Sequence, residues 1–390
     1  MDSLLLSSPG VASLTNGSYP TKISQHKRKP QIEYNYLRFR QPMLNQHYKC
    51  TAEVSRYQDC NEQYVAKMTT RPYSDSEPHP SSAKNILDIM KKFWDAFFMF
   101  TSPYAILTQT LGVLSSSLLA VEKLTDISPL FFIGVLQVAI PYSFMAIFVA
   151  GMNQLTDLDI DKINKPYLPL ASGQISFTTG VIITASFLTL SLWLGWVLGS
   201  WPLVWGIVSN CLLWIAYSVN VPFLRWKGNP FLAATCIFAT WAVVFPISSF
   251  LHMQTFVFKR SLAFPKSLIS TVTFMSLYSV GIALCKDVPD VEGDAKFGIY
   301  SFAARFGQKR VFQICVFLFE MAFGVAFLAG ATSPSLWIKI VTGVGHVILA
   351  SVLWYQAKST DLSSKSSIIS FYFFIWKLLC AEYLLLPLAR

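Results

Sequence analysis

The stretch from Pro129 to Asp161, PLFFIGVLQVAIPYSFMAIFVAGMNQLTDLDID, decides the class of this chain. Up to Met152 it contains no charged side chain. A helix needs about 20 apolar residues to cross a bilayer, so this run predicts a transmembrane helix. Three aspartates follow directly, which places acidic chemistry at the membrane surface.

The composition extends this reading to the whole chain. Of its 390 residues, 53% are hydrophobic and 13% charged, and the mean hydropathy is +0.45. Such values are typical of membrane proteins and exclude an ordinary soluble domain. The net charge of +10 comes with no recognised nucleic-acid motif, so no nucleic-acid partner is expected, and the seven cysteines show no metal-site spacing.

Apolar runs of spanning length recur along the chain and predict an all-α, polytopic membrane protein with a bundle of about nine transmembrane helices in one domain, residues 81–390. The expected spans are Tyr104–Val121, Pro129–Met152, Phe177–Leu198, Trp201–Ser218, Phe231–Leu251, Leu268–Leu284, Val311–Gly330, Leu336–Trp354 and Ile368–Leu386. The loops after the second, fourth, sixth and eighth spans lie on one face of the membrane, because an even number of crossings separates them. That face holds most of the loop lysines and arginines, so it faces the cytoplasm or the stroma.

Residues 1–80 differ from the rest of the chain. They are rich in Ser, Gln, Asn and basic residues and poor in acids. This composition is typical of an organelle transit peptide, here expected to direct the chain to a plastid (chloroplast) membrane, although a disordered cytosolic tail has a similar composition.

Two loops on the shared face carry acidic motifs. On a continuing helix, Asn153, Asp157 and Asp161 project from one face because they lie four residues apart. Asp287, Asp290 and Asp294 have spacings of three and four, although Pro289 is expected to bend the chain. Such oxygen ligands suit Mg²⁺, which substrate phosphates then complete.

Acidic loop residues are often only solvated, but two clusters on one face with basic neighbours favour a shared site for a polyanion. The cations expected to neutralise this anion are Lys162, Lys165, Arg225 and Lys286.

The motifs NQLTDLDID (153–161) and KDVPDVEGD (286–294), together with DKINKPYLPLASG (161–173), resemble the UbiA superfamily of intramembrane aromatic prenyltransferases. Within it, the chain is most similar to legume flavonoid and isoflavonoid (pterocarpan) dimethylallyltransferases. The resemblance implies a helical bundle around a lipid-accessible cavity. It also implies that the Mg²⁺ ligands on a prenyl diphosphate are Asn153, Asp157, Asp161, Asp287, Asp290 and Asp294.

Two positions depart from the family pattern. Val221 replaces a frequent Tyr ahead of Arg225, and Ser102 stands where many relatives have Arg. Loss of that cation fits an acceptor without a carboxylate.

The implied reaction is Mg²⁺-dependent transfer of a dimethylallyl group from dimethylallyl diphosphate to an aromatic carbon of a flavonoid, isoflavonoid or pterocarpan. Asp157, Asp161, Asp287, Asp294 and Arg225 are the expected catalytic residues, and Asn153, Lys162, Lys165, Arg225 and Lys286 the expected substrate-binding residues. Homogentisate prenylation is the near alternative, and transport of an anionic solute is the alternative from another class.

Overall fold

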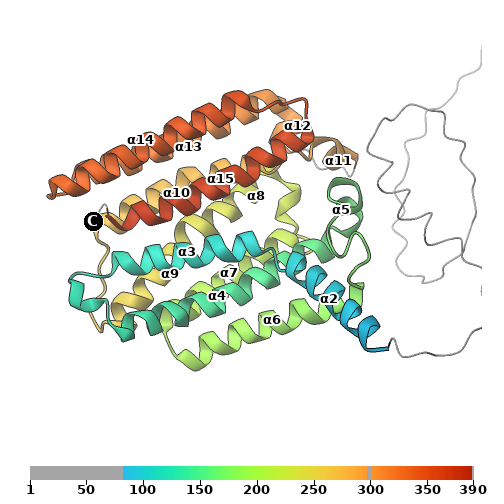
Figure 1. The fold of residues 1–390 in the computed structure, drawn as a ribbon, viewed down its shortest axis with the longest axis horizontal. Helices are drawn as coiled ribbons and strands as arrows, with labels where there is room; N and C mark the ends of the chain where they lie inside the picture. Colours follow the sequence, from blue (N-terminus) through green and yellow to red (C-terminus); the bar gives the residue numbers. More distant parts are fainter. Residues whose placement is uncertain (1–81, 297–300, 389–390) are drawn as a thin grey trace, which may run out of the picture. The chain divides into compact units, whose positions relative to one another are not determined.

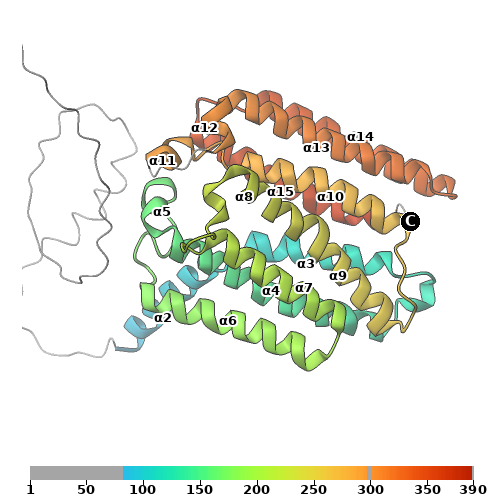
Figure 2. The ribbon, with the colours of Figure 1, turned by 180° about the vertical axis from the view of Figure 1, so that it is seen from behind.

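The computed structural model describes residues 82–296 and 301–388, apart from the side chains of residues 82–86, 292, 293 and 295. The predicted transit peptide and tail, residues 1–80, lie outside the described residues. The described chain is helical, and Figures 1 and 2 show its long helices lying side by side. The helices of the bundle are α2 (Ser82–Phe100), α3 (Pro103–Leu119), α4 (Pro129–Thr156), α6 (Phe177–Leu198), α7 (Trp201–Ser218), α8 (Pro230–Phe238), α9 (Phe245–Leu251), α10 (Lys266–Cys285), α13 (Gln308–Ala331), α14 (Leu336–Ser359) and α15 (Lys365–Leu385).

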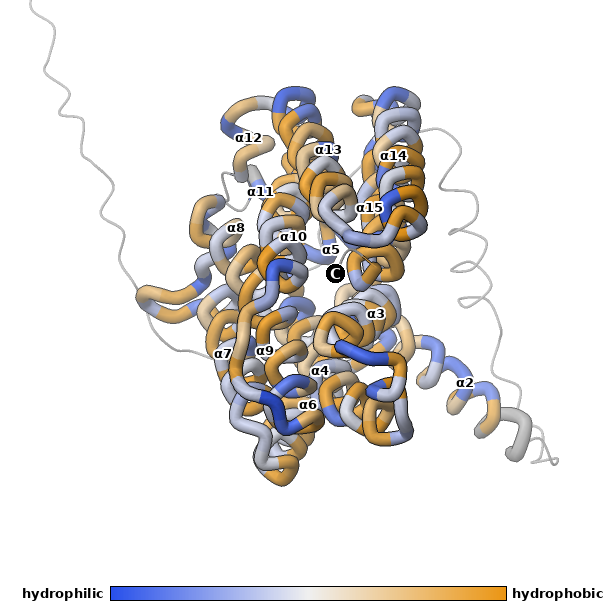
Figure 3. The backbone as a smooth tube through the Cα atoms, turned by 90° about the vertical axis from the view of Figure 1, so that its left-hand side faces the viewer, coloured by the Kyte–Doolittle hydropathy of each residue, from blue (hydrophilic) through white to orange (hydrophobic). Residues whose placement is uncertain are grey.

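Eight spans in the described part of the chain are long and apolar enough to cross a membrane, or nine if a bent pair counts as one more. The prediction of an all-α bundle of about nine transmembrane helices is therefore confirmed. One span, Pro230–Val257, joins α8 and α9 through π-helical segments at Ala239–Val244 and His252–Val257. Figure 3 shows hydrophobic positions along the coils and hydrophilic positions mainly at their turned ends.

The bent pair is α2 with α3, which meet at an angle of 52°. The break falls at Ser102, whose φ is 52°, and α3 begins directly at Pro103. Proline disfavours the helical conformation for the residue before it, which explains the break. The predicted first span begins one residue later, and α2 was not predicted from the sequence.

Close helix contacts hold the bundle together. A Cβ added to Gly151 on α4 would collide with the Thr184 hydroxyl of α6, so only glycine permits this approach. The Ser191 hydroxyl of α6 also donates a hydrogen bond to the Pro141 carbonyl of α4, at 2.8 Å. These contacts fix α6 against the helix that carries the first acidic motif.

Polar contacts fix helix ends and interiors elsewhere. Arg260 reaches the Asp126 carboxylate at 2.7 Å and the Ala120 carbonyl at 2.8 Å, which ties together two loops. Its hydrogen bond lowers the pKa of Asp126 to about 2. Inside the bundle, His346 Nε2 of α14 lies 3.0 Å from Glu382 Oε1 of α15, and both side chains are buried.

The short helices α5 (Leu158–Asn164), α11 (Val291–Lys296) and α12 (Phe302–Phe306) lie at one end of the bundle (Figure 1). α5 contacts α11 there. Because α5 follows α4 and α11 follows α10, this end brings the two acidic motifs together.

Candidate functional site

A polar cavity of about 390 Å³ opens where α4 and α10 end. Eight of the residues that the sequence analysis predicts for the site line this cavity: Asn153, Asp157, Asp161, Lys165, Lys286, Asp287, Asp290 and Asp294. Residues more than 120 positions apart in the sequence thus share one cavity. We call it the polar chamber.

The first motif keeps its helical spacing across an interruption. α4 ends at Thr156, and Asp157 leaves the helical conformation before α5 begins. The Asp157 amide still donates to the Asn153 carbonyl at 3.0 Å, and the Asp161 amide to the Asp157 carbonyl at 2.8 Å. The four-residue spacing therefore directs the three side chains to one side, although the helix is not continuous.

The second motif is a turn rather than a continuous helix. After α10 ends at Cys285, the Asp287 and Val288 amides bond carbonyls only three residues back, and Pro289 precedes α11. The Asp294 amide donates to the Asp290 carbonyl at 2.9 Å. The bend expected at Pro289 is present, so Asp287 reaches the chamber from the turn and not from the helix that carries Asp294.

Two lysines pair with carboxylates of the second motif. Lys165 Nζ lies 2.9 Å from Asp290 Oδ2, which links the segment after the first motif to the second motif. Lys286 pairs with Asp287 beside it. Burial alone lowers the pKa of Lys165, but the nearby Asp290 carboxylate more than offsets this and leaves the pKa above its usual value.

Lys227 is a chamber residue that was not predicted from the sequence. Its Nζ lies 2.7 Å from Asp157 Oδ2 and 2.8 Å from Thr156 Oγ1, and its side chain is 8% exposed. Burial lowers the pKa of Lys227. It stands two residues after Arg225 in the same loop, and neither spacing nor charge distinguishes these two cations in the sequence.

Two predicted residues lie apart from the chamber lining. Lys162 pairs with Asp159 at 3.0 Å on the exposed side of α5. Arg225 Nη2 approaches Asp157 Oδ1 at 3.7 Å but does not line the cavity. Helical spacing explains the first case, because Lys162 follows Asp161 directly and projects from a different face.

The chamber offers unsatisfied oxygen atoms to a cation. Asp157 Oδ1 and Asp290 Oδ1 are buried and have no hydrogen-bond partner among the described residues, although Arg225 lies 3.7 Å from the first. Within the described residues, no group of three acidic, His or Cys side chains is close enough to hold a metal alone. Mg²⁺ normally binds one or two carboxylates and completes its shell with water and phosphate, so these residues fit Mg²⁺ with a diphosphate.

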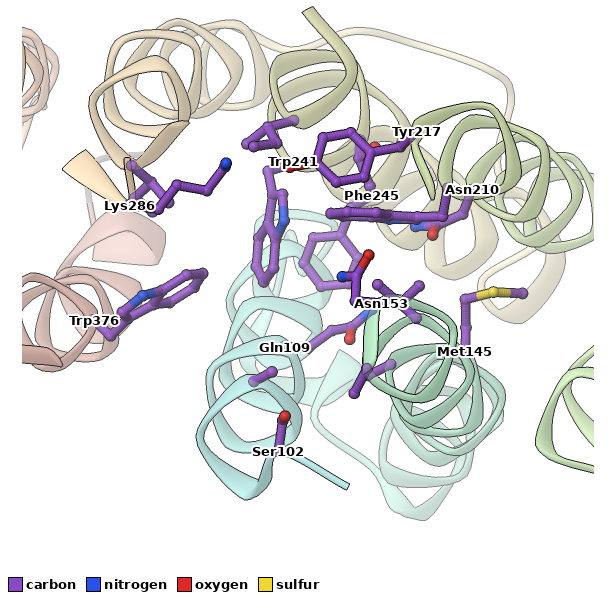
Figure 4. Close-up of a pocket in the computed structure, with 18 of the residues that line it drawn as sticks. Ser102, Gln109, Met145, Asn153, Asn210, Tyr217, Trp241, Phe245, Lys286 and Trp376 are labelled. Atoms are coloured by element: carbon purple, nitrogen blue, oxygen red, sulfur yellow. The ribbon is translucent and has the colours of Figure 1, made fainter. Parts of the chain in front are cut away.

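A second cavity of about 300 Å³ continues from the polar chamber into the bundle. The two share Ser102, Ala150, Asn153, Tyr217, Lys286 and Tyr372. Aromatic rings dominate the second cavity (Figure 4): Trp241 lies 5.4 Å from Trp376 and 5.9 Å from Phe245 between ring centres. We call it the aromatic chamber.

Packed side chains close the inner end of the aromatic chamber. Phe245 lines it, and Tyr142 packs behind Phe245 with ring centres 5.1 Å apart. The Tyr142 and Ser248 hydroxyls are 2.6 Å apart, and neither residue is exposed. The chamber therefore has a floor within the bundle.

Protonation of two motif carboxylates predicts a pH dependence. Burial raises the pKa of Asp161 and of Asp294 to about 6. As the pH falls through this value the carboxyls take up protons, which a cation must displace. The Mg²⁺ concentration for half-maximal turnover should therefore rise between pH about 7.5 and about 5.5. An unchanged Mg²⁺ requirement over this range would contradict the prediction.

The chain is similar in sequence to known prenyltransferases. Residues 110–378 match the model of the UbiA prenyltransferase family. Glycinol 4-dimethylallyltransferase of Glycine max is 57% identical in an alignment that covers 96% of this chain and 91% of that protein. Naringenin 8-dimethylallyltransferase 2, chloroplastic, of Sophora flavescens is 49% identical over 98% of both chains. Homogentisate phytyltransferase 1, chloroplastic, of Arabidopsis thaliana is 54% identical over 76% of this chain and 75% of its own.

A solved structure shares the fold. The UbiA homologue from Archaeoglobus fulgidus bound to GPP and Mg²⁺ superposes with a TM-score of 0.51, covering 75% of this chain and 99% of its own at 17% identity.

Proposed function

The chain belongs to the UbiA prenyltransferase family, and on that premise we propose that it transfers a dimethylallyl group from dimethylallyl diphosphate to an aromatic carbon of a flavonoid, isoflavonoid or pterocarpan. The observation that carries this proposal is the pair of joined chambers, one polar and one aromatic. A diphosphate suits the first, and a flat phenol with a short prenyl group suits the second.

The polar chamber would bind and stabilise the diphosphate. Mg²⁺ held by the motif carboxylates would supply Lewis-acid contact to the phosphate oxygens. The residues proposed to hold it are Asn153, Asp157, Asp161, Asp287, Asp290 and Asp294. Lys165, Lys227 and Lys286 would oppose the negative charge that grows on the diphosphate as its C–O bond breaks.

The aromatic chamber would receive the allyl group. Tyr217 lies where the two chambers meet, and Trp241 lies deeper in the aromatic chamber. The faces of such aromatic rings stabilise a cation. The chamber is predominantly apolar, so it limits access of water to the allyl cation. An electron-rich ring carbon of the phenol then attacks the cation, and the ring proton passes to the released diphosphate or to a motif carboxylate, which restores the aromatic ring.

Homogentisate is the alternative acceptor, because one relative is a homogentisate phytyltransferase. Its carboxylate would need a cation in the aromatic chamber. Lys286 is the one charged residue among the described lining residues, and it already pairs with Asp287. Burial of an uncompensated carboxylate is costly, which favours the neutral polycyclic phenols.

The reaction is tested with purified protein in detergent or lipid vesicles. Diphosphate release and a prenylated product should require dimethylallyl diphosphate, Mg²⁺ and an isoflavonoid together. An anion transporter would instead move its solute across vesicles without releasing diphosphate. Absence of product with every flavonoid acceptor would contradict the proposed function.

The tail gives a separate prediction about location. Two of the three relatives reported above are named as chloroplastic proteins, and we propose a plastid membrane for this multi-pass chain. Deletion of residues 1–80 should leave catalysis in isolated membranes largely intact, because no motif residue lies there, but should misdirect the protein in plant cells. Residues 1–80 fused to a fluorescent protein should enter plastids. A cytosolic fusion would contradict the assignment.

A further inference from the structure

Two buried side-chain amides in the aromatic chamber have no hydrogen-bond partner among the described residues. Gln109 on α3 is 8% exposed and Asn210 on α7 is 2% exposed, and both line the chamber. Neither side chain makes a hydrogen bond within the described part of the chain. Figure 4 shows both reaching from different helices towards the space beside Asn153 and Phe245.

The two amides lie well below the polar chamber. Gln109 follows Ser102, the residue directly before α3, by seven residues, which is about 10 Å at 1.5 Å per residue. Asn210 precedes Ser218 by eight residues on α7, or about 12 Å. The Ser218 hydroxyl marks the level of the first motif, because it donates to Asn153 Oδ1 at 2.7 Å.

Their position makes the diphosphate an unsuitable partner, since of its proposed ligands and cations only Asn153 and Lys286 also line the aromatic chamber, at its junction with the polar one. A prenyl hydrocarbon offers no hydrogen bond, and it would leave both buried amides unsatisfied, which is unfavourable. A carboxamide both donates and accepts, so it suits a neutral hydroxyl or carbonyl oxygen.

We propose that Gln109 and Asn210 are specificity-determining residues that hydrogen-bond oxygen atoms of the phenolic acceptor at the inner end of the aromatic chamber. This inference rests on the proposed function, because it assigns the acceptor to this chamber. The acceptor ring held between these amides and Asn153 presents a carbon to the allyl group at the junction of the two chambers.

Acceptor binding without prenyl diphosphate tests the inference directly. Trp214 and Trp241 line the chamber, so tryptophan fluorescence reports occupancy by an added phenol. The probes are isoflavones and pterocarpans from which one hydroxyl at a time is removed. We expect the unmodified protein to bind the hydroxylated compound about 10- to 100-fold more tightly than at least one deoxy analogue.

Asn210→Leu and Gln109→Met keep side-chain size but remove the hydrogen-bonding groups. Each variant should bring the affinity ratio of a hydroxylated acceptor and its deoxy analogue close to one, while the KM for dimethylallyl diphosphate changes less than about twofold. Gln254→Leu is the matched control, because Gln254 is also 8% exposed but lies outside the chamber lining. It should keep the ratio of the unmodified protein.

Two results would overturn the inference: equal weakening of both analogues in the variants, as general damage would produce, or an unchanged ratio. The two amides are changed separately, so misfolding of one variant leaves the other to decide. If the unmodified protein binds these phenols selectively but prenylates none of them, the proposed reaction fails while the binding ratios still decide the roles of Gln109 and Asn210.

Discussion

Asp157→Ala, Asp161→Ala, Asp287→Ala and Asp294→Ala should each lower turnover by about two to four orders of magnitude, because each removes an oxygen ligand from the shared Mg²⁺–diphosphate site that we propose. All four line the polar chamber. The effect is expected in kcat as well as in the Mg²⁺ requirement, because the charge of the diphosphate grows in the transition state. Initial rates of product formation at several Mg²⁺ concentrations measure both.

The matching control is Asp159→Ala. Asp159 lies between Asp157 and Asp161 in the sequence, but its side chain is 80% exposed and pairs with Lys162 outside the chamber. It should retain most activity. Asp161→Asn keeps the size of the side chain and separates loss of charge from loss of packing. Near-full activity of any of the four chamber variants, in protein that still inserts into membranes, would refute a site shared by both motifs.

The second large effect concerns the acceptor. With dimethylallyl diphosphate, turnover of an isoflavonoid or pterocarpan should exceed that of homogentisate by about 100-fold or more, because an unpaired carboxylate would be buried in the aromatic chamber. Competition between the two acceptors in one reaction, with products separated by chromatography, measures this ratio. Efficient prenylation of homogentisate with no turnover of flavonoids would overturn the acceptor assignment and leave the metal site unaffected.

Ser102 offers a way to shift this ratio. It lines both chambers at the break between α2 and α3. Ser102→Arg adds a cation at the junction, where it can pair with a carboxylate. We expect a partial shift towards homogentisate. The φ of 52° at this position is already unfavourable for serine, so arginine adds no new backbone conflict.

The helical bundle could be predicted from the sequence, because a membrane-spanning helix is recognised by the length and apolar composition of a run of residues. The bounds of Phe177–Leu198 and Trp201–Ser218 were predicted to the residue, since Gly199 in the left-handed region and Pro202 separate these helices. The π-helical segments were not predicted, because an extra residue in a helical turn leaves the apolar pattern almost unchanged. These segments belong to the span that places Thr240 and Trp241 in the aromatic chamber.

Site residues were predictable where charge and spacing agreed, as for Asp157 and Asp161. The aromatic chamber could not be predicted, because Gln109, Asn210 and Trp241 lie in apolar runs. Such residues in such runs usually lie at the membrane interface or pack against other helices. Their roles depend on which helix faces meet in three dimensions. Lys227 was missed for another reason: the loop between α7 and α8 holds two cations, and only its path decides which one is buried beside Asp157.

The floor formed by Tyr142, Phe245 and Ser248 also bears on the membrane itself. An energised membrane maintains an ion gradient, and a continuous aqueous path through a protein would let ions cross and dissipate that gradient. Here the aromatic chamber ends against side chains that are at most 2% exposed. The protein can therefore hold a charged substrate at one surface without making the bilayer permeable, and vesicles that contain it should retain a proton gradient while the enzyme turns over.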